Sequence, residues 1–522
     1  MTTTLNFKDY LDLPMWRPEA PALANTAAGS SLAWDHRNTV AGSPYHYLLR
    51  SATAFDAHDP TTGDWMALAS PALAGTFGAG ATAVFHPSQG PRGTLAAGAT
   101  TSKIILTTAL PAAVGVNQLA NRGDGIGFRI KIIGNAAGSS GKIEYRNIVA
   151  NTGGTTPTIW LDSPLTFTPI LGDGYEIRSG QVFLLSAGVL AAGAFKFYDI
   201  CTNSYNSVAR SIVNLPATVG TDSSAVALSE SHVPYNRSPG EGFISGAGTY
   251  DGGVKNCIVA TASSSTTITG AGMFADLQAN EYRNFQVRIV EDTAIPTAVN
   301  QRRRIASHTG GATGAFTVAA FAVTPSATAK FVIENDDDKI LLRSTATALV
   351  YTHNIAANTW DSTTWAAPVA HGAGVTFEQS FGIERDVGAN ARHSNLFCIR
   401  GGGSTAIDVL DIAGAATGAW SNDIIYGKKG QAFTTGTNGA YDPATMQGRF
   451  LHLCINGTQR QARFDMKNRV LDASTFLRFP QGTAIVGQKM ANGMFIDGAT
   501  KANLVYQLTH TQAQMFSLVI QR

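Results

Sequence analysis

Short apolar runs that end in a polar residue or a glycine recur along the chain. Each run is followed by a second predicted strand that ends in a polar residue. Runs of about four to eight apolar residues bounded by turn residues are typical of buried β-strands. The pattern therefore predicts one β-hairpin unit that is repeated six times. The six apolar runs with their exits are Tyr47–Ser51, Phe183–Ala187, Ile340–Ser344, Phe397–Gly401, Leu453–Gly457 and Met494–Gly498.

The end of each second strand carries a further pattern, in which a polar residue is followed by a bulky one. An aspartate or asparagine stabilises a tight turn by hydrogen bonding to its own backbone. The bulky residue is placed to fill the wedge between neighbouring units, and glycines let inner strands approach closely. We predict that all these residues are structural. The pairs are Asp59 with Trp65, Asp199 with Tyr205, Asn354 with Trp360, Asp411 with Trp420, Asp465 with Leu471 and Thr509 with Met515, and the glycines are Gly401, Gly402, Gly457 and Gly498.

A short predicted strand precedes each unit and an outer strand follows it, which makes four strands in each of six units. Radial repetition of four-stranded units is typical of a β-propeller. The three shorter intervals between equivalent positions are 57, 56 and 41 residues. These intervals lie near the period of about 50 residues in kelch repeats, which the units resemble. We predict an all-β fold, a six-bladed kelch-like β-propeller; the alternative is a β-sandwich whose hairpins are alike by chance.

The ends of the chain lead to separate predictions. Several prolines argue against a long helix in residues 1–29, so we expect an extended arm on its own or a neighbouring subunit, with Trp16 as a candidate anchor. We expect Phe516–Ile520 to form the outer strand of the last blade. Because the first blade begins with its own inner strand, Ser31–Trp34, we expect neither terminus to complete the other's blade.

Two longer intervals, of 136 and 157 residues, predict insertions in the second and third blades. The inserts resemble each other, because Gly127–Ile132 matches Asn284–Ile289 and Asn151–Gly154 matches His308–Gly311. We predict a duplicated small β-sandwich or barrel, with both copies on one face of the propeller. The predicted divisions are residues 1–29 for the arm, 30–86, 180–235 and 337–522 for the propeller, 87–179 for the first insert and 236–336 for the second.

Composition narrows the classes of function. Charged residues make up 14% of the chain, against about 25% in ordinary soluble proteins. The net charge of +2 gives no global reason to expect nucleic-acid binding. No apolar run approaches the roughly 20 residues of a membrane span, and the first residues do not resemble a secretory signal. The absence of a CxxC motif argues against zinc and favours four reduced cysteines of a protein made in a cytoplasm, Cys201, Cys257, Cys398 and Cys454.

Catalytic equipment is not evident in the sequence. The arginine cluster and Ser-x-Asp-x-Gly-x-Thr-Trp boxes of sialidase propellers are absent, as are the paired Tyr and His ligands of copper oxidases. We predict no catalytic, cofactor or metal site; a propeller hydrolase or lyase with an unrecognised channel site stays a third hypothesis. Asp336–Asp338 is expected to be a solvated turn, with a cation site as the alternative. Arg302–Arg304 is expected to be a solvated or inter-subunit face, with phosphate binding as the alternative.

Two smaller features are also expected to be structural. His46, His353 and His452 are predicted to be strand or turn residues without a catalytic role. Gly123–Gly127 contains three glycines, but it lacks the preceding strand and following helix of a dinucleotide-binding loop. We expect a hairpin turn there.

The inserts carry a resemblance to structural proteins of tailed bacteriophages. The segments concerned are Gly125–Ile133, Asn151–Gly154 and Gly172–Ile177, together with a Thr/Ala/Gly-rich texture. A propeller with β-domain insertions is similar to the nozzle proteins of short-tailed phages, which form a ring beneath the portal and adaptor. The resemblance implies a non-enzymatic virion component in the tail, neck or collar, made in the cytoplasm of a bacterial host. It also implies a homo-oligomeric ring, contacts with portal, adaptor or tail proteins, and passage of DNA without sequence-specific binding. The alternative is a capsid-decoration or receptor-binding protein for host attachment.

Overall fold

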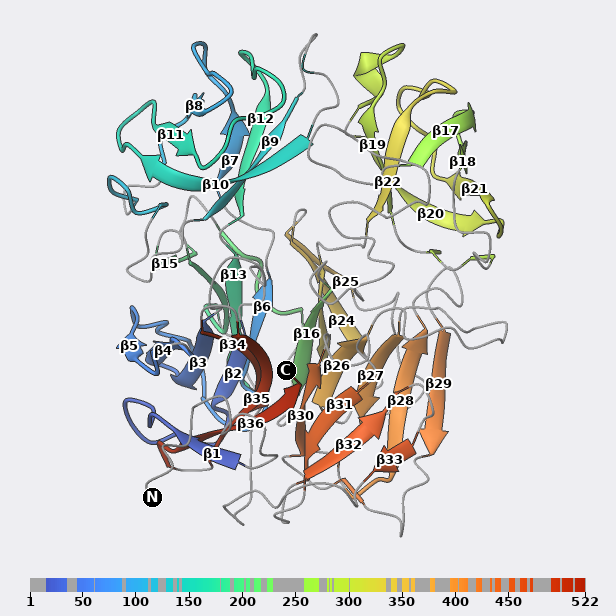
Figure 1. Ribbon diagram of the computed structural model, residues 1–522. Helices are drawn as coiled ribbons and strands as arrows, with labels where there is room; N and C mark the ends of the chain where they lie inside the picture. The colour runs from blue at the N-terminus through green and yellow to red at the C-terminus, as the bar shows by residue number, and fades with distance from the viewer. Residues whose placement is uncertain are drawn as a thin grey trace, which may run out of the picture.

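The chain folds into β-sheets in the computed structural model (Figure 1). The described residues lie between 16 and 521, and the longest stretches that are not described are 35–44, 229–257, 362–375, 381–394 and 473–489. Among the described residues there is no α-helix, and the one helical element is a short 3-10 turn, η2 (Pro296–Ala298). No helix in this part of the chain is long and apolar enough to cross a membrane. The predicted all-β class is confirmed.

Six four-stranded antiparallel sheets make up one part of the molecule. We number them one to six in chain order, and each is given from its first to its outermost strand. They are β2 (Ser31–Trp34), β3 (His46–Ser51), β4 (Ala54–His58) and β5 (Trp65–Ala67); β6 (Thr82–His86), β13 (Gln181–Leu185), β14 (Phe195–Asp199) and β15 (Ser204–Tyr205); β16 (Ser224–Leu228), β23 (Lys339–Arg343), β24 (Val350–Asn354) and β25 (Thr359–Asp361); β26 (Thr376–Ser380), β27 (Asn395–Ile399), β28 (Ala406–Asp411) and β29 (Ala419–Ile424); β30 (Asn438–Asp442), β31 (Phe450–Cys454), β32 (Gln461–Asp465) and β33 (Val470–Asp472); and β34 (Met490–Asp497), β35 (Thr500–Leu508), β36 (Met515–Gln521) and β1 (Trp16–Glu19).

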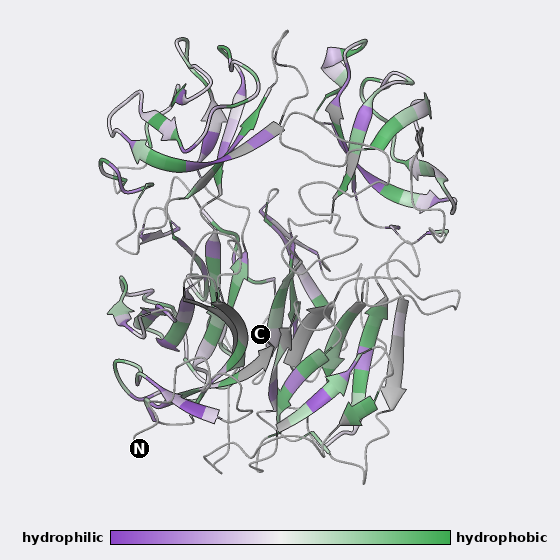
Figure 2. Cartoon of the chain, in the orientation of Figure 1, coloured by the Kyte–Doolittle hydropathy of each residue, from purple (hydrophilic) through white to green (hydrophobic). Residues whose placement is uncertain are grey.

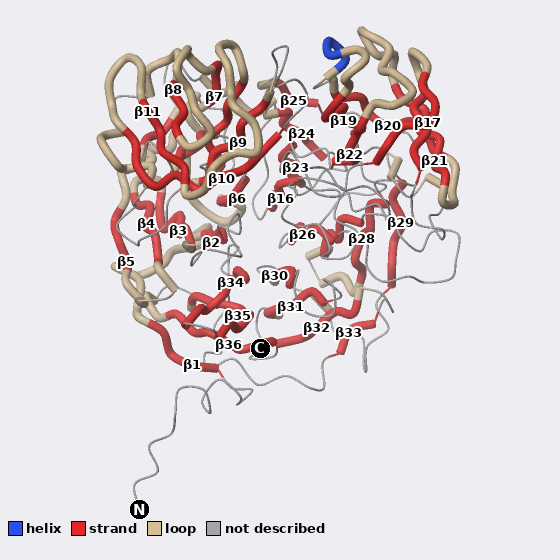
Figure 3. Tube along the Cα trace, turned by 45° about the horizontal axis from the view of Figure 1, so that its top comes forward, coloured by secondary structure: helices blue, strands red, loops and turns tan. Residues whose placement is uncertain are grey.

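The first strands of the six sheets contact one another in a cycle. Each of β2, β6, β16, β26 and β30 contacts the first strand of the next sheet, and β34 contacts β2 again. Figure 3 shows these first strands around the middle of the group of six sheets. The sheets therefore follow one another around a common centre.

Buried apolar side chains lie between neighbouring sheets. Phe183 of β13 shares a cluster with Leu342 of β23, and Phe397 of β27 shares another with Phe464 of β32. The second strands of sheets one to five are covered on both faces, so their apolar runs are continuous and do not alternate. Figure 2 shows long apolar stretches along these strands.

The N-terminal strand corrects the prediction for the chain ends. β1 pairs with β36, with Trp16 opposite Leu518 and Glu19 opposite Met515, and it is the outermost strand of sheet six. The predictions that residues 516–520 form the outer strand, and that neither terminus completes the other's sheet, are therefore wrong. An edge strand tolerates Pro18, because the N–H that proline lacks is not needed on the open side. The run Met494–Gly498 was expected to follow a short inner strand, but β34, which contains most of this run, is itself the first strand of sheet six.

Two inserted β-domains interrupt sheets two and three. Insert one lies between β6 and β13, and insert two lies between β16 and β23. Both therefore leave after the first strand of a sheet, and Figure 1 shows both on the same side of the six sheets. Insert one contains β7 (Arg92–Thr94), β8 (Lys103–Ile105), β9 (Arg129–Ile133), β10 (Ile143–Asn151), β11 (Thr158–Leu161) and β12 (Gly174–Arg178), and insert two contains β17 (Ile258–Ser263), β18 (Thr267–Ala271), β19 (Gln286–Glu291), β20 (Arg302–His308), β21 (Thr313–Val318) and β22 (Lys330–Glu334).

The two inserts have the same strand connectivity. Insert one is a sheet in the order β7-β12-β9-β10-β11-β8, and insert two is a closed barrel in the order β17-β18-β21-β20-β19-β22. When the six strands of each insert are numbered one to six in chain order, the same numbered strands pair with each other in both inserts. A bridge between Leu95 and Leu106 also joins the ends of β7 and β8, at the position where insert two closes.

Candidate functional site

The outermost strand of most sheets places one bulky residue against the preceding sheet. Trp65 packs in a cluster with Leu504 of sheet six, and its Nε1 donates a hydrogen bond to the Ala20 carbonyl (3.0 Å). The Tyr205 ring lies 6.5 Å from Phe55 of sheet one, measured between centroids. These residues therefore occupy the wedges between sheets.

The same position recurs in the next sheets. The Trp360 ring lies 5.1 Å from Phe195 of sheet two, and Trp420 packs against the cluster that contains Leu341 of sheet three. Leu471 lies in the cluster between sheets four and five. In sheet six the equivalent residue is Trp16 of β1, which packs against Ala440 and Cys454 of sheet five. Met515 begins the third strand, so its predicted pairing with Thr509 does not mark an outermost strand.

The remaining predicted blade residues lie at strand ends or outside the described part of the chain. The Asp59 carbonyl accepts a hydrogen bond from the Gly63 backbone N–H (2.8 Å) in the turn before β5. Gly401 is buried beside the Gly403 turn, where φ is +86°. The last residues of the third strands are Asp199, Asn354, Asp411 and Asp465, and the residues outside the described part are Gly402, Gly457 and Gly498.

A buried ionic cluster connects sheets three and four and was not found from the sequence. The Asp408 carboxylate accepts hydrogen bonds from Nη2 and Nε of Arg400, at 2.7 and 3.0 Å. Its other oxygen lies 4.0 Å from Nη2 of Arg343, and both side chains of this second pair are fully buried. The Arg343 guanidinium lies 5.6 Å from the centroid of the Trp420 ring. Arg343 is a single charged residue at the end of an apolar strand. No periodic pattern in the sequence indicates that its partner, Asp408, lies on the next sheet.

The three histidines predicted to be structural, His46, His353 and His452, are buried within the sheets. Nδ1 of His46 lies 3.3 Å from Nδ1 of His58. Burial lowers the pKa of His353 to about 4 and the pKa of His452 to about 3, so both are neutral near pH 7. Within the described part of the chain, no group of three or more His, Cys, Asp or Glu residues is placed to hold a metal ion.

The other sequence candidates fall in different places. Cys398 and Cys454 are free and buried, and burial raises the pKa of each thiol to about 12. Arg302–Arg304 lies in β20 and is half-buried, and Nε of Arg303 donates to a backbone carbonyl at 2.7 Å; the expected solvated or inter-subunit face stays a prediction. The residues outside the described part are Cys201, Cys257, Gly123–Gly127 and Asp336–Asp338.

The inserts share side-chain geometry as well as connectivity. Asn117 donates its backbone N–H to the Asn151 carbonyl (2.8 Å), and its Oδ1 accepts from the Asn151 N–H (3.2 Å). Asn280 makes the same two contacts with His308, both at 3.0 Å. The two asparagines have φ of +60° and +63°, a conformation that asparagine tolerates better than most residues. The register therefore aligns the Asn151 and His308 segments that the sequence comparison matched.

A second shared arrangement is built on an arginine. In insert one, the Arg146 guanidinium donates to Glu144 and, from Nε, to a backbone carbonyl at 3.2 Å. In insert two, Arg303 donates to Oε1 of Gln301 (3.3 Å) and to the equivalent backbone carbonyl. Glu144 also accepts from the Thr166 backbone N–H (3.0 Å), as Gln301 does from backbone N–H groups of the matching loop. The Glu144 carboxylate and the Gln301 amide oxygen therefore accept equivalent hydrogen bonds in the two inserts.

Glu144→Gln should accordingly change the free energy of unfolding by no more than about 1 kcal/mol, because Gln301 shows that an amide oxygen satisfies this loop. Glu144→Ala should cost about 1–2 kcal/mol, since Arg146 and the Thr166 N–H group would lose their buried acceptor. Urea unfolding of both variants, followed by circular dichroism, measures the difference. Equal losses in the two variants would contradict the equivalence.

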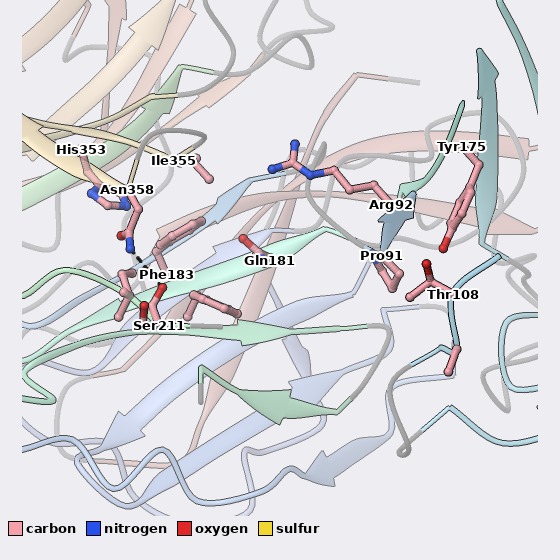
Figure 4. Close-up of a pocket in the computed structure, with 13 residues that line it drawn as sticks. Pro91, Arg92, Thr108, Tyr175, Gln181, Phe183, Ser211, His353, Ile355 and Asn358 are labelled. Carbon is pink, nitrogen blue, oxygen red and sulfur yellow. Dashed lines mark hydrogen bonds between the residues drawn. The ribbon is translucent and has the colours of Figure 1, made fainter. Parts of the chain in front are cut away.

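A cavity of about 380 Å³ lies where insert one meets sheets two and three. Arg92 and Tyr175 reach it from insert one, Gln181 and Phe183 from sheet two, and His353 from sheet three (Figure 4). The mixture of aromatic rings and a few polar groups is typical of small-molecule sites, as is the volume. The sequence did not indicate this cavity.

Comparison with known proteins does not identify a family. No protein-family model matches the chain, and no curated protein matches it. A protein of unknown function from Bacteroides thetaiotaomicron is 9% identical, with 82% of this chain and 98% of that chain covered and a TM-score of 0.19. An auxiliary nutrient binding protein from the same organism is 9% identical, with 83% and 85% covered and a TM-score of 0.21. The Penicillium chrysogenum alpha-L-arabinanase complexed with arabinobiose is 10% identical, with 66% and 90% covered and a TM-score of 0.23. Similarity at this level carries no argument about fold or function.

Proposed function

We propose that the chain is a non-enzymatic structural component of a tailed-phage virion, in the tail or neck. Its six sheets act as the blades of a rigid six-bladed, kelch-like propeller, and the duplicated inserts mediate assembly contacts with further copies and with neighbouring virion proteins. The cyclic contacts of the first strands and the position of both inserts on one side support this arrangement.

The observation that carries the proposal is a difference between the two inserts. Val116, Val149 and Trp160 of insert one are exposed, and they lie around one end of β10 and β11. Val149 occupies a β-bulge, and Trp160 pairs with Ala150 next to it. Exposed apolar patches of this kind mark contact surfaces on soluble proteins.

Insert two provides the internal comparison, because its register aligns with that of insert one. Its residue at the equivalent bulge is Ala306, and its residue opposite the bulge is Thr317. The same fold is thus built with small or polar residues at these positions. The large apolar residues of insert one are therefore not required for folding, which supports a role in contacts with a partner.

Exchanging the insert-one residues for those of insert two tests this proposal. The variant Val149→Ala with Trp160→Thr should remain folded and should lose most of the ring assembly that mass photometry detects for the unaltered chain. Leu171→Ala, which alters another exposed apolar residue of insert one, is the matched control and should leave assembly unchanged. A monomeric unaltered chain, or equal assembly of all three proteins, would contradict a ring role. Electron microscopy of the virion would reject the proposal if the protein were absent from the particle.

The second candidate is a capsid-decoration or receptor-binding protein for host attachment. The cavity beside insert one favours it, because a structural ring has no need of a small-molecule site. A trimer in mass photometry, together with loss of host adsorption when the protein is removed, would support this candidate over the first.

A further inference from the structure

Two polar side chains of the cavity make no hydrogen bond to a described residue. They are Gln181, which is 4% exposed, and Tyr175, which is 3% exposed, and both line the cavity. Neither the Gln181 amide nor the Tyr175 hydroxyl is among the buried side-chain atoms that lack a partner, so both groups reach the open space of the cavity. A ligand in the cavity can therefore pair with both groups.

Arg92 is the one charged side chain among the described residues that line the cavity. Arg92 is exposed at the cavity and forms no ion pair with a described residue. No aspartate or glutamate lines the cavity among the described residues. His353 is neutral near pH 7, and burial raises the pKa of Tyr175 to about 12, so its hydroxyl stays a donor. The cavity therefore favours a ligand with one negative charge and disfavours an ammonium group.

The shape of the lining indicates the rest of the ligand. Figure 4 shows Gln181 between Arg92 and Tyr175 on one side and His353 and Phe183 on the other. An amide and a phenol can each donate and accept, which suits a ring that carries several hydroxyl groups. Aromatic rings offer apolar surface to the C–H face of such a ring.

We propose that this cavity binds a small saccharide unit that carries a carboxylate, of the uronic acid class. Arg92 pairs with the carboxylate, as a guanidinium does through two parallel hydrogen bonds. Gln181 and Tyr175 pair with hydroxyl groups, and Phe183 packs against the ring. A phosphate fits less well, because the described lining holds one cation and no helix N-terminus. The inference goes beyond the structural role and does not depend on it.

Titration calorimetry of the full chain with methyl glucuronide, methyl glucoside and inorganic phosphate tests the proposal. We expect the glucuronide to bind with a Kd on the order of 1 mM or below, and the glucoside and phosphate to bind at least about tenfold more weakly. Arg92→Gln should weaken glucuronide binding about tenfold and remove the preference over glucoside. Tyr175→Phe, which deletes one hydroxyl, should weaken both sugars by a similar factor.

Lys103→Gln is the matched control, because Lys103 is another cation of insert one and does not line the cavity. It should leave all three affinities unchanged. Circular dichroism and thermal unfolding establish that each variant is folded before it is titrated. The proposal is overturned if the unaltered chain binds no glucuronide, if phosphate binds as tightly, or if Lys103→Gln loses as much affinity as Arg92→Gln. None of these results depends on whether the chain assembles into a ring.

Discussion

Replacing Asp408 with alanine should lower the free energy of unfolding by about 3–5 kcal/mol, the usual cost of leaving a buried charge without its partner. Asp408 stands between the Arg400 and Arg343 guanidinium groups, and the Arg343 side chain is fully buried. Without the carboxylate, Arg343 would retain its charge in a site closed to water. The apolar neighbours Trp420 and Leu341 cannot compensate for that charge.

The pair of Arg50 and Asp56 in sheet one provides the matched comparison. Nε of Arg50 donates to Asp56 at 2.7 Å, but the Arg50 side chain keeps 20% of its surface exposed. When Asp56 is replaced by alanine, Arg50 can turn toward water, so we expect a loss of only about 1–2 kcal/mol. The midpoint of urea unfolding, followed by tryptophan fluorescence, separates the two variants.

A double variant isolates the charge from the packing. Arg343→Met in the Asp408→Ala background removes the guanidinium that has lost the Asp408 carboxylate, so it should recover part of the lost stability. If the double variant is less stable than Asp408→Ala alone, the cost comes from packing and the ionic explanation is wrong.

The second strands of sheets one to five could be predicted because burial on both faces leaves a direct trace in the sequence. Phe183–Leu185 and Ile340–Leu342 are continuous apolar runs, and both are second strands whose faces meet neighbouring sheets. The similarity of the inserts was visible for the same reason, since equivalent positions in β9 and β19 face equivalent cores. A local sequence pattern is enough to predict a strand where the same buried surroundings recur in each copy of a repeated unit.

The pairings between distant segments could not be predicted. β1 has four residues and contains Pro18, so neither its length nor its alternation identifies a strand. Its partner β36 lies at the other end of the chain. Similarly, Arg92, Gln181 and His353 line one cavity. They come together only because insert one lies against sheets two and three. Such contacts follow from the closed arrangement of the sheets, which no local window of sequence contains.

Trp16→Ala should cost about 2 kcal/mol and should selectively loosen β36, because Trp16 fills the wedge between sheets five and six and holds β1 in place. The same substitution at Met66 of the outermost strand β5 is the control. Met66 is 52% exposed, so its loss should change stability by no more than about 0.5 kcal/mol.

Removing residues 1–19 extends the test, because it uncovers the backbone N–H and C=O groups of β36 that pair with β1. An uncovered edge strand invites pairing with a second chain, so the shortened protein should exchange the β36 amide hydrogens faster and should associate on size-exclusion chromatography. Hydrogen exchange read by mass spectrometry compares β36 with β32, a third strand whose partners on both sides are retained. Unchanged exchange in β36 after both Trp16→Ala and the truncation would show that β1 does not close sheet six in solution. Faster exchange in β36 and β32 alike would mean that the N-terminal strand holds the whole ring of sheets together, since the loss would then have spread beyond its own sheet.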